Sequence, residues 1–350
     1  MERKRGRNTC TSTSVASDSI DTPLPPSKKK KKKEKKTGEN PEQDGIYGGE
    51  SKIPYHGEVD CAKCKNRAYW IVADGRCMCG VHSKKEGDAR KPLPKRSRAF
   101  LVQRRTEILK DHDASVEEVR KRNAASGVRG GVRLFRMRMM KNPPLTDGWM
   151  NVFPNYRHQN RKDGYGCMKL SPKSLGPVEH GQPGLPPAVN IENFHQGSKC
   201  FAEETDEAGD PSLLYYENRF KFYKDPVPHR HKYIGQSPTG NKNIPKYFVW
   251  VDREGTSHRL SYVESRQFYS NFYERLASRE PDFVRLRSMV DAGTNVCICG
   301  YDATPLEEGE TIEHAYMDAS KPFGHERVLY AMLCFAPTQW PWRLHKTFDF

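Results

Sequence analysis

The clearest alternation of apolar and polar residues lies between positions 261 and 276. Ser261 and Glu264 have the spacing of a capping box, so we predict that a helix begins near Tyr262. Aromatic and apolar residues then recur along one helical stripe, which we expect to be core: Tyr262, Tyr269, Phe272, Tyr273 and Leu276. Three charged residues between them are expected to face water or a ligand: Arg266, Glu274 and Arg275.

Beyond this helix, the pattern predicts a second helix, a strand and a last helix. Pro281 suits the first position of a helix, and Gly293 suits its end. Residues 295–299 (NVCIC) are small or β-branched and indicate a buried strand. The last helix is expected to begin around residues 320–326, and a hairpin at 247–260 precedes the whole series. This order is typical of an α/β layer domain, with a core over residues 245–335.

Ligands of such sheets lie beyond the carboxyl ends of strands and against helix amino termini, where unpaired N–H groups favour anions. Here this rule gathers Gly300, Tyr301 and Gly324 with the candidate acid, base and orienting residues Asp302, His325 and Glu326, and with Arg266 as a further candidate. In the alternative interpretation, His325 and Glu326 only cap the last helix. Cys297 and Cys299 are interpreted as small buried residues rather than paired ligands.

Charge and composition change the picture of the amino-terminal half. Lys and Arg outnumber Asp and Glu by 59 to 44, and the excess is concentrated toward the amino end, which favours a polyanionic partner such as nucleic acid. There is no run of eighteen apolar residues and no apolar leader at the start. We therefore expect a soluble, intracellular protein without a membrane partner, in a reducing compartment where its 10 cysteines act as thiols or metal ligands.

Residues 1–50 have almost nothing to bury and are expected to form a disordered basic arm. Its densest charge is a run of six lysines: Lys28, Lys29, Lys30, Lys31, Lys32 and Lys33. The run could serve in nuclear targeting or in sequence-independent contact with phosphates, which weakens as salt rises. The alternative is a solubilising tail.

Residues 58–85 contain two half-sites of a zinc ribbon or knuckle. Cys61 and Cys64 form the first, and Cys79 and His82 form the second. Together they would complete a Cys3His shell around one zinc ion, which leaves no open position for catalysis at the metal. Cys77 could replace Cys79 in the shell. The alternative is a set of buried thiols.

Residues 86–141 form a basic connector, with one helix expected over 99–110 and a second, opened by a capping box at Ser115, over 115–125. Four arginines follow among glycine and apolar residues: Arg129, Arg133, Arg136 and Arg138. They suit either a surface that tracks a nucleic-acid backbone or an edge strand with one wet basic face. Residues 148–260 are dense in Pro, Gly, Asn and His and predict a loop-rich segment, with a helix over 212–223.

Several runs, among them NYRHQNRKDG, LSPKSLGPV, ENFHQGSKCF, SYVESRQFYSNFYERL and KPFGHERVLYAML, resemble a group of uncharacterised proteins of large double-stranded DNA viruses. The resemblance covers about residues 55–335 and implies a viral setting rather than a chemistry. Two shorter strings, SNFY at 270–273 and EHAYM at 313–317, resemble the NADAR family of ADP-ribose-linked N-glycosidases. The gap between them looks too long for that family and the first falls inside a capped helix, so we interpret this pair as coincidence.

The sequence thus predicts an α+β or α/β protein with a basic arm, a zinc module and a basic connector. Residues 148–350 are expected to hold a loop-rich segment followed by a carboxyl-terminal α/β domain with its core at 245–335. We expect a zinc-containing protein that binds or packages nucleic acid, in a host nucleus, viral factory or virion. The alternatives are an enzyme that cleaves a nucleotide or nucleotide-sugar bond at the carboxyl-terminal domain, and a structural virion protein that binds other virion proteins.

Overall fold

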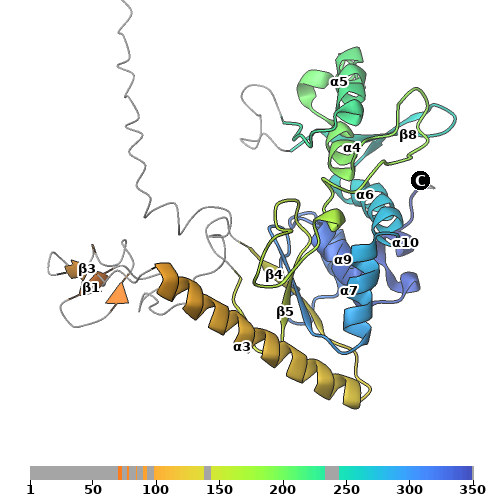
Figure 1. Cartoon of the computed structure of the whole chain (residues 1–350). Helices are drawn as coiled ribbons and strands as arrows, with labels where there is room; N and C mark the ends of the chain where they lie inside the picture. Colours follow the sequence, from red (N-terminus) through yellow and green to blue (C-terminus); the bar gives the residue numbers. More distant parts are fainter. Residues whose placement is uncertain are drawn as a thin grey trace, which may run out of the picture. The chain divides into compact units, whose positions relative to one another are not determined.

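The fold is described from a computed structural model (Figure 1), which describes residues 70–72, 77–78, 84, 90–92, 98–137, 143–232 and 244–348. All of them belong to one compact unit, Glu42–Phe350. The strands are β1 (Trp70–Val72), β2 (Cys77–Met78), β3 (Arg90–Pro92), β4 (Val132–Arg136), β5 (Met150–Phe153), β6 (Tyr165–Gly166), β7 (Lys199–Cys200), β8 (Tyr247–Val251), β9 (Ser257–Leu260) and β10 (Val296–Gly300). The α-helices are α3 (Arg98–Ala125), α4 (Ile191–Gly197), α5 (Leu213–Lys224), α6 (Tyr262–Ala277), α7 (Pro281–Asp291), α8 (Ile312–Met317), α9 (His325–Cys334) and α10 (Pro341–Leu344).

The described chain is a mixed α/β structure built on a four-stranded parallel sheet. The strand order is β4-β10-β5-β6, and each neighbouring pair is parallel. Every residue of β10 is buried, as its small and β-branched side chains predict for a strand covered on both faces. In the register of the sheet, Ile298 of β10 lies beside Leu134 of β4 and Val152 of β5.

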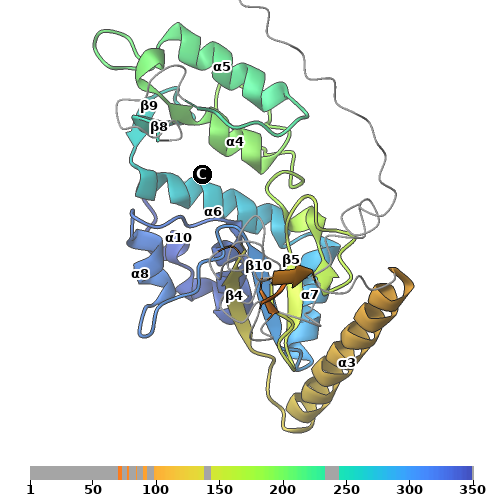
Figure 2. The same cartoon turned by 90° about the vertical axis from the view of Figure 1, so that its left-hand side faces the viewer.

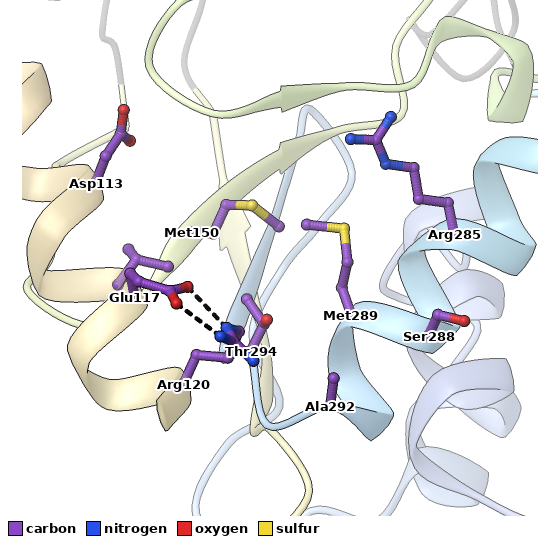
Figure 3. Close-up of a pocket in the computed structure, with 10 residues that line it drawn as sticks. Asp113, Glu117, Arg120, Met150, Arg285, Ser288, Met289, Ala292 and Thr294 are labelled. Atoms are coloured by element: carbon purple, nitrogen blue, oxygen red, sulfur yellow. Dashed lines mark hydrogen bonds and ion pairs between the residues drawn. The ribbon is translucent and has the colours of Figure 1, made fainter. Parts of the chain in front are cut away.

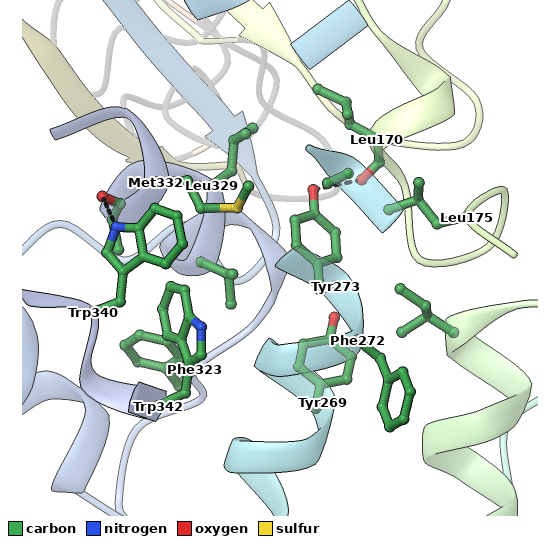
Figure 4. Close-up of a cluster of buried hydrophobic side chains, with 14 of the residues drawn as sticks. Leu170, Leu175, Tyr269, Phe272, Tyr273, Phe323, Leu329, Met332, Trp340 and Trp342 are labelled. Atoms are coloured by element: carbon green, nitrogen blue, oxygen red, sulfur yellow. Dashed lines mark hydrogen bonds between the residues drawn. The ribbon is translucent and has the colours of Figure 1, made fainter. Parts of the chain in front are cut away.

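The two faces of this sheet are buried by different parts of the chain. Leu134, Val152 and Ile298 belong to the main hydrophobic core, together with residues of α6, α7 and α9. Figure 2 shows α6 and α7 beside the strands of this sheet, and Figure 4 shows Tyr273 of α6 near Leu329 and Met332 of α9. Phe153, Cys297 and Cys299 alternate with them and form a smaller cluster on the other face. The predicted helix, strand and helix at 281–334 are therefore confirmed, and so is β4 as an edge strand.

A small antiparallel sheet, β7-β8-β9, lies in the middle of the chain next to α4 and α5. The predicted hairpin is confirmed as β8 and β9, and the predicted helix over 212–223 as α5. Nearer the amino end, β1 pairs with β2 and β3 in a separate antiparallel sheet. In the sequence, β1 lies between the two predicted zinc half-sites.

The connector helices require a correction, because α3 is one continuous helix from Arg98 to Ala125. Ser115, which we expected to open a second helix, donates to the His112 carbonyl one turn back and accepts from the Gly148 amide at 3.1 Å. The capping-box spacing misled because the hydroxyl is engaged within the helix and by a distant loop. Asn123 further along α3 bonds the Gly293 carbonyl at 2.8 Å and so joins α3 to the end of α7.

The expected wet face of α6 also requires a correction. Its capping box is present, with Ser261 accepting from the Glu264 amide, but Arg266 and Glu274 are buried. Glu274 accepts from the Trp342 indole at 2.8 Å and pairs with Arg343, so it fastens α10 to α6. Helices and strands surround α6 on most sides, which leaves little of it for solvent.

Among the described residues, no helix combines the length and apolar character needed to cross a membrane.

Candidate functional site

Glu326 lies where the carboxyl end of β10 meets the amino terminus of α9. Gly300, the last residue of β10, lies directly against this carboxylate. A Cβ atom at that position would come within 2.0 Å of Glu326 Oε1, so any residue larger than glycine would collide with it. Gly324, the N-cap of α9, lies on the other side, with a built Cβ 3.1 Å from Oε2. The strand end and the helix start thus enclose a carboxyl group that is almost fully buried.

Burial raises the pKa of Glu326 above its usual value of 4.5, because a buried charge loses its hydration. The neighbouring His325 opposes this shift and the charge of Asp302 adds to it, while the backbone amides of Asp302 and of Glu326 itself favour the ionised form. The amides that we expected to hold a ligand anion therefore already face a carboxylate of the chain itself.

His325 and Glu326 place two ionisable side chains next to each other. The His325 Nε2 donates to the Pro154 carbonyl at 3.0 Å. Its Nδ1 lies 3.0 Å from Glu326 Oε2, but that oxygen makes no hydrogen bond among the described residues. A histidine beside a buried carboxyl group is a combination that acid–base chemistry uses.

Of the sequence candidates, Asp302, His325 and Glu326 are brought together, and Arg266 is not placed with them. Asp302 is exposed at the rim, with its Cβ 3.3 Å from a Cβ built on Gly324. Arg266 instead bonds backbone carbonyls at the end of α8 and in the loop after it, including Tyr316, Asp318 at 3.0 Å and Lys321 at 2.6 Å. Its guanidinium satisfies carbonyls that a helix end leaves open, which explains its burial.

Sequence reasoning missed the loop after β5, which carries side chains to this edge of the sheet. Asn155 donates to the Cys299 carbonyl at 3.0 Å and ties the loop to β10. The His158 ring lies 6.2 Å from the Tyr301 ring, and Arg161 pairs with the buried Asp163 at 2.8 Å. The signal was available, because the polar run NYRHQNRKD directly follows a strand, but the strand β5 itself was not predicted.

The prediction that Cys297 and Cys299 are buried is confirmed, with exposed fractions of 2% and 0%. Their sulfur atoms lie 4.0 Å apart on the same face of β10. The hydrogen bond with the Cys299 thiol lowers the pKa of Cys297 to about 7, and Arg133 contributes a smaller part of this shift. Burial raises the pKa of Cys299.

The arginines that we predicted to bind nucleic acid differ in their exposure and in their partners within the fold. Arg129 pairs with Asp291 at 2.7 Å, and the guanidinium of Arg133 lies 4.3 Å from the centre of the Trp149 ring. Arg136, the last residue of β4, is exposed, and its Nε donates to the Tyr301 carbonyl at 3.3 Å. Arg138 and the six lysines at 28–33 lie outside the described residues, so their proposed role stays a prediction.

The predicted zinc ligands also lie outside the described residues: Cys61, Cys64, Cys79 and His82. The structure describes Cys77 as the first residue of β2. Elsewhere in the described ranges, no group of three or more His, Cys, Asp or Glu side chains is arranged to hold a metal ion. His229 and His231, for instance, contact different carboxylates, Asp225 at 2.7 Å and Glu204 at 2.9 Å.

An open cleft of about 370 Å³ lies between α3 and α7 at the start of β5 (Figure 3). Its walls are mostly apolar, and Figure 3 shows the side chains of Met150 and Met289 pointing toward one another across it. Glu117 and Arg120 form an ion pair at its α3 side. The cleft includes none of the residues gathered at the carboxyl end of β10.

Comparison with known proteins identifies no family for this chain: no family model, curated protein or solved structure matches it.

Proposed function

We propose that this is a zinc-containing, nucleic-acid-associated protein whose amino-terminal part supplies most of the positive charge and whose carboxyl-terminal α/β part supplies a rigid body. The observation that supports it best is the separation of charge along the chain. Residues 1–150 hold 35 Lys and Arg against 19 Asp and Glu, whereas residues 151–350 hold 24 against 25. A polyanion would therefore be attracted to the first 150 residues.

The contacts of the described arginines refine this proposal. Arg129 pairs with Asp291 and Arg133 lies over the Trp149 ring, so we assign phosphate contact to exposed cations outside the ion pairs of the described residues. On α3 these include Lys110 and Arg122, and at the sheet edge Arg136. Together with the six lysines of the arm, they would hold a nucleic-acid backbone without reading its sequence.

The test is the salt dependence of binding by the full-length protein to labelled single-stranded and double-stranded oligonucleotides. Replacing the six lysines at 28–33 by glutamine should weaken binding and reduce the slope of log K against log salt by up to about 5, because each phosphate contact releases about one counterion. Binding should be similar for unrelated sequences. A slope close to zero for the unmodified protein would exclude the proposal.

A matched control removes the same charge from the other half of the chain. Six exposed cations of the carboxyl-terminal part can be replaced by glutamine: Lys169, Lys173, Lys221, Lys224, Arg230 and Lys232. If nucleic acid binds through the positive charge of the amino-terminal part, this variant should keep most of the slope of log K against log salt. Equal losses in both variants would mean that binding follows net charge alone.

The position of His325 Nδ1, 3.0 Å from the buried Glu326 carboxyl group, favours a second candidate function. We propose, as an alternative, that the carboxyl end of β10 cleaves a nucleotide or nucleotide-sugar bond, with Glu326 as acid or base and His325 as its proton partner. Asp302 at the rim would face the substrate. This proposal requires the substrate to displace part of the rim, because Glu326 is 1% exposed.

Incubating the protein with a panel of nucleotides and nucleotide sugars, with products followed by mass spectrometry, tests this alternative. Glu326→Gln should lower any turnover by about 100-fold or more, since it removes the exchangeable proton. Glu308→Gln, an exposed carboxylate of the following loop, is the matched control and should leave turnover unchanged. Turnover that survives Glu326→Gln would reject the assignment.

A further inference from the structure

Exposed aromatic rings and exposed cations meet at the carboxyl edge of the parallel sheet. Tyr301, the first residue after β10, is 44% exposed, and Tyr156, in the loop after β5, is 43% exposed. Arg136 and Arg157 are also exposed, one at the end of β4 and one beside Tyr156 in the loop. Exposed aromatic rings together with cations are the combination with which proteins hold single-stranded nucleic acid.

The arrangement of these groups is fixed by the sheet. Arg136 lies opposite Gly300 in the register of β4 and β10, and its Nε donates to the Tyr301 carbonyl. The His158 ring is tilted by 47° to the Tyr301 ring at 6.2 Å and meets Phe153 edge-on at 5.8 Å. Because Asn155 donates to the Cys299 carbonyl of β10, the loop is held against the strand that Tyr301 directly follows.

We propose that Tyr301, with His158 and Arg136, forms a stacking site for an unpaired base of single-stranded nucleic acid. This inference rests on the proposed nucleic-acid association and specifies its ligand. The exposed ring of Tyr301 offers its face to a base, and Arg136 and Arg157 contact the flanking phosphates. Tyr156 offers a second ring in the same loop.

Charge at this edge favours a polyanion over an acidic or apolar protein surface. The nearby Arg161 is neutralised by the buried Asp163, and Glu326 is buried beneath the rim. Asp302 is the exposed anion of the site, and Arg136 and Arg157 outnumber it. Base pairs in a duplex hide their faces in the stack, so a ring used in this way selects unpaired bases.

The experiment compares Tyr301→Ala and Tyr301→Phe in the full-length protein for binding to a single-stranded oligonucleotide over a range of salt concentrations. Stacking releases no counterions, so Tyr301→Ala should weaken binding by about 5- to 150-fold at every salt concentration without changing the slope. Tyr301→Phe keeps the ring and should bind like the unmodified protein. Phe220→Ala, which removes a ring 41% exposed on α5, is the matched control and should have no effect.

The outcomes separate this inference from the function on which it rests. If the unmodified protein shows no salt-dependent binding, the proposed function fails. If it binds and Tyr301→Ala binds equally well, or loses as much affinity for duplex as for single strands, the stacking site fails alone. Photocrosslinking of an oligonucleotide with 5-iodouracil should label the peptide that contains Tyr301, and labelling confined to other peptides would also overturn the site.

Discussion

At the scale of single residues, Glu326 is a buried carboxyl group with defined neighbours. Gly300 provides the space, His325 Nδ1 lies 3.0 Å from one carboxyl oxygen, and the Asp302 amide provides a donor. The sequence was sufficient to gather these residues, because a strand end followed by a helix start is a recurrent ligand position. It could not show that Glu326 itself would fill the position, since that depends on a glycine that approaches from the strand.

The raised pKa of Glu326 predicts how stability depends on pH. Because the native pKa lies above the unfolded value of about 4.5, folding favours the protonated form. The stabilisation is complete below that value and is lost as pH rises through the native pKa. The free energy of unfolding of the unmodified protein, relative to Glu326→Gln, should therefore fall as pH increases from 4.5 to 8 in denaturant titrations. A difference that stays constant or grows would contradict the raised pKa.

A second residue-scale prediction concerns Gly300. Replacement by alanine places a methyl group against the Glu326 carboxyl group and should destabilise the fold by about 1–3 kcal/mol. Chemical denaturation measures this change. In a Glu326→Ala background the same replacement should cost clearly less, because the clash is relieved. Additive effects of the two changes would show that another neighbour limits Gly300.

At the scale of elements, α6 shows what periodicity can and cannot establish. Its start was predicted from Ser261 and Glu264, and part of its aromatic stripe, Tyr269, Phe272 and Tyr273, is core. The burial of Arg266 and Glu274 was not predicted, because a helix enclosed on several sides also buries polar residues, each with a fixed partner. Their partners lie 50 to 69 residues away in the chain, beyond any local pattern.

This pairing gives a prediction for the attachment of α10 to α6. Glu274→Ala should lower the free energy of unfolding by about 3 kcal/mol, because the Trp342 indole loses its acceptor in a buried position. Arg343→Ala should cost only about 1 kcal/mol, since that side chain is 48% exposed and solvent screens its charge. Urea denaturation of both variants provides the comparison. A larger loss for Arg343→Ala would reverse the assignment.

At the scale of the whole molecule, the sequence predicted the layered α/β class and its carboxyl-terminal elements but not the full sheet. Two of the four parallel strands, β5 and β6, come from the loop-rich middle, where short strands carry little periodic signal. β4 was recognisable as an edge strand but could not be assigned to β10, which follows it by about 160 residues. Likewise, the sequence predicted two helices where α3 is a single one, because Ser115 has the spacing of a capping box.

Metal content gives the prediction for the amino-terminal module. The purified full-length protein should contain about one zinc ion per chain, and Cys61→Ser or His82→Ala should reduce it to near zero. Cys79→Ser should do the same while Cys77→Ser should not, because Cys79 belongs to the predicted shell. Elemental analysis measures the zinc, and protease resistance of the region around residues 58–85 reports its fold independently. Full zinc content in Cys79→Ser would identify Cys77 as the ligand instead.

The order of the strands has a consequence for synthesis of the protein. β10 lies between β4 and β5, yet it is translated more than 140 residues after either. While the ribosome makes the intervening chain, β4 has no strand of this sheet to pair with and β5 has only the two residues of β6. Any nascent chain that ends before residue 296 would therefore present open strand edges, which invite aggregation or chaperone capture until the central strand emerges.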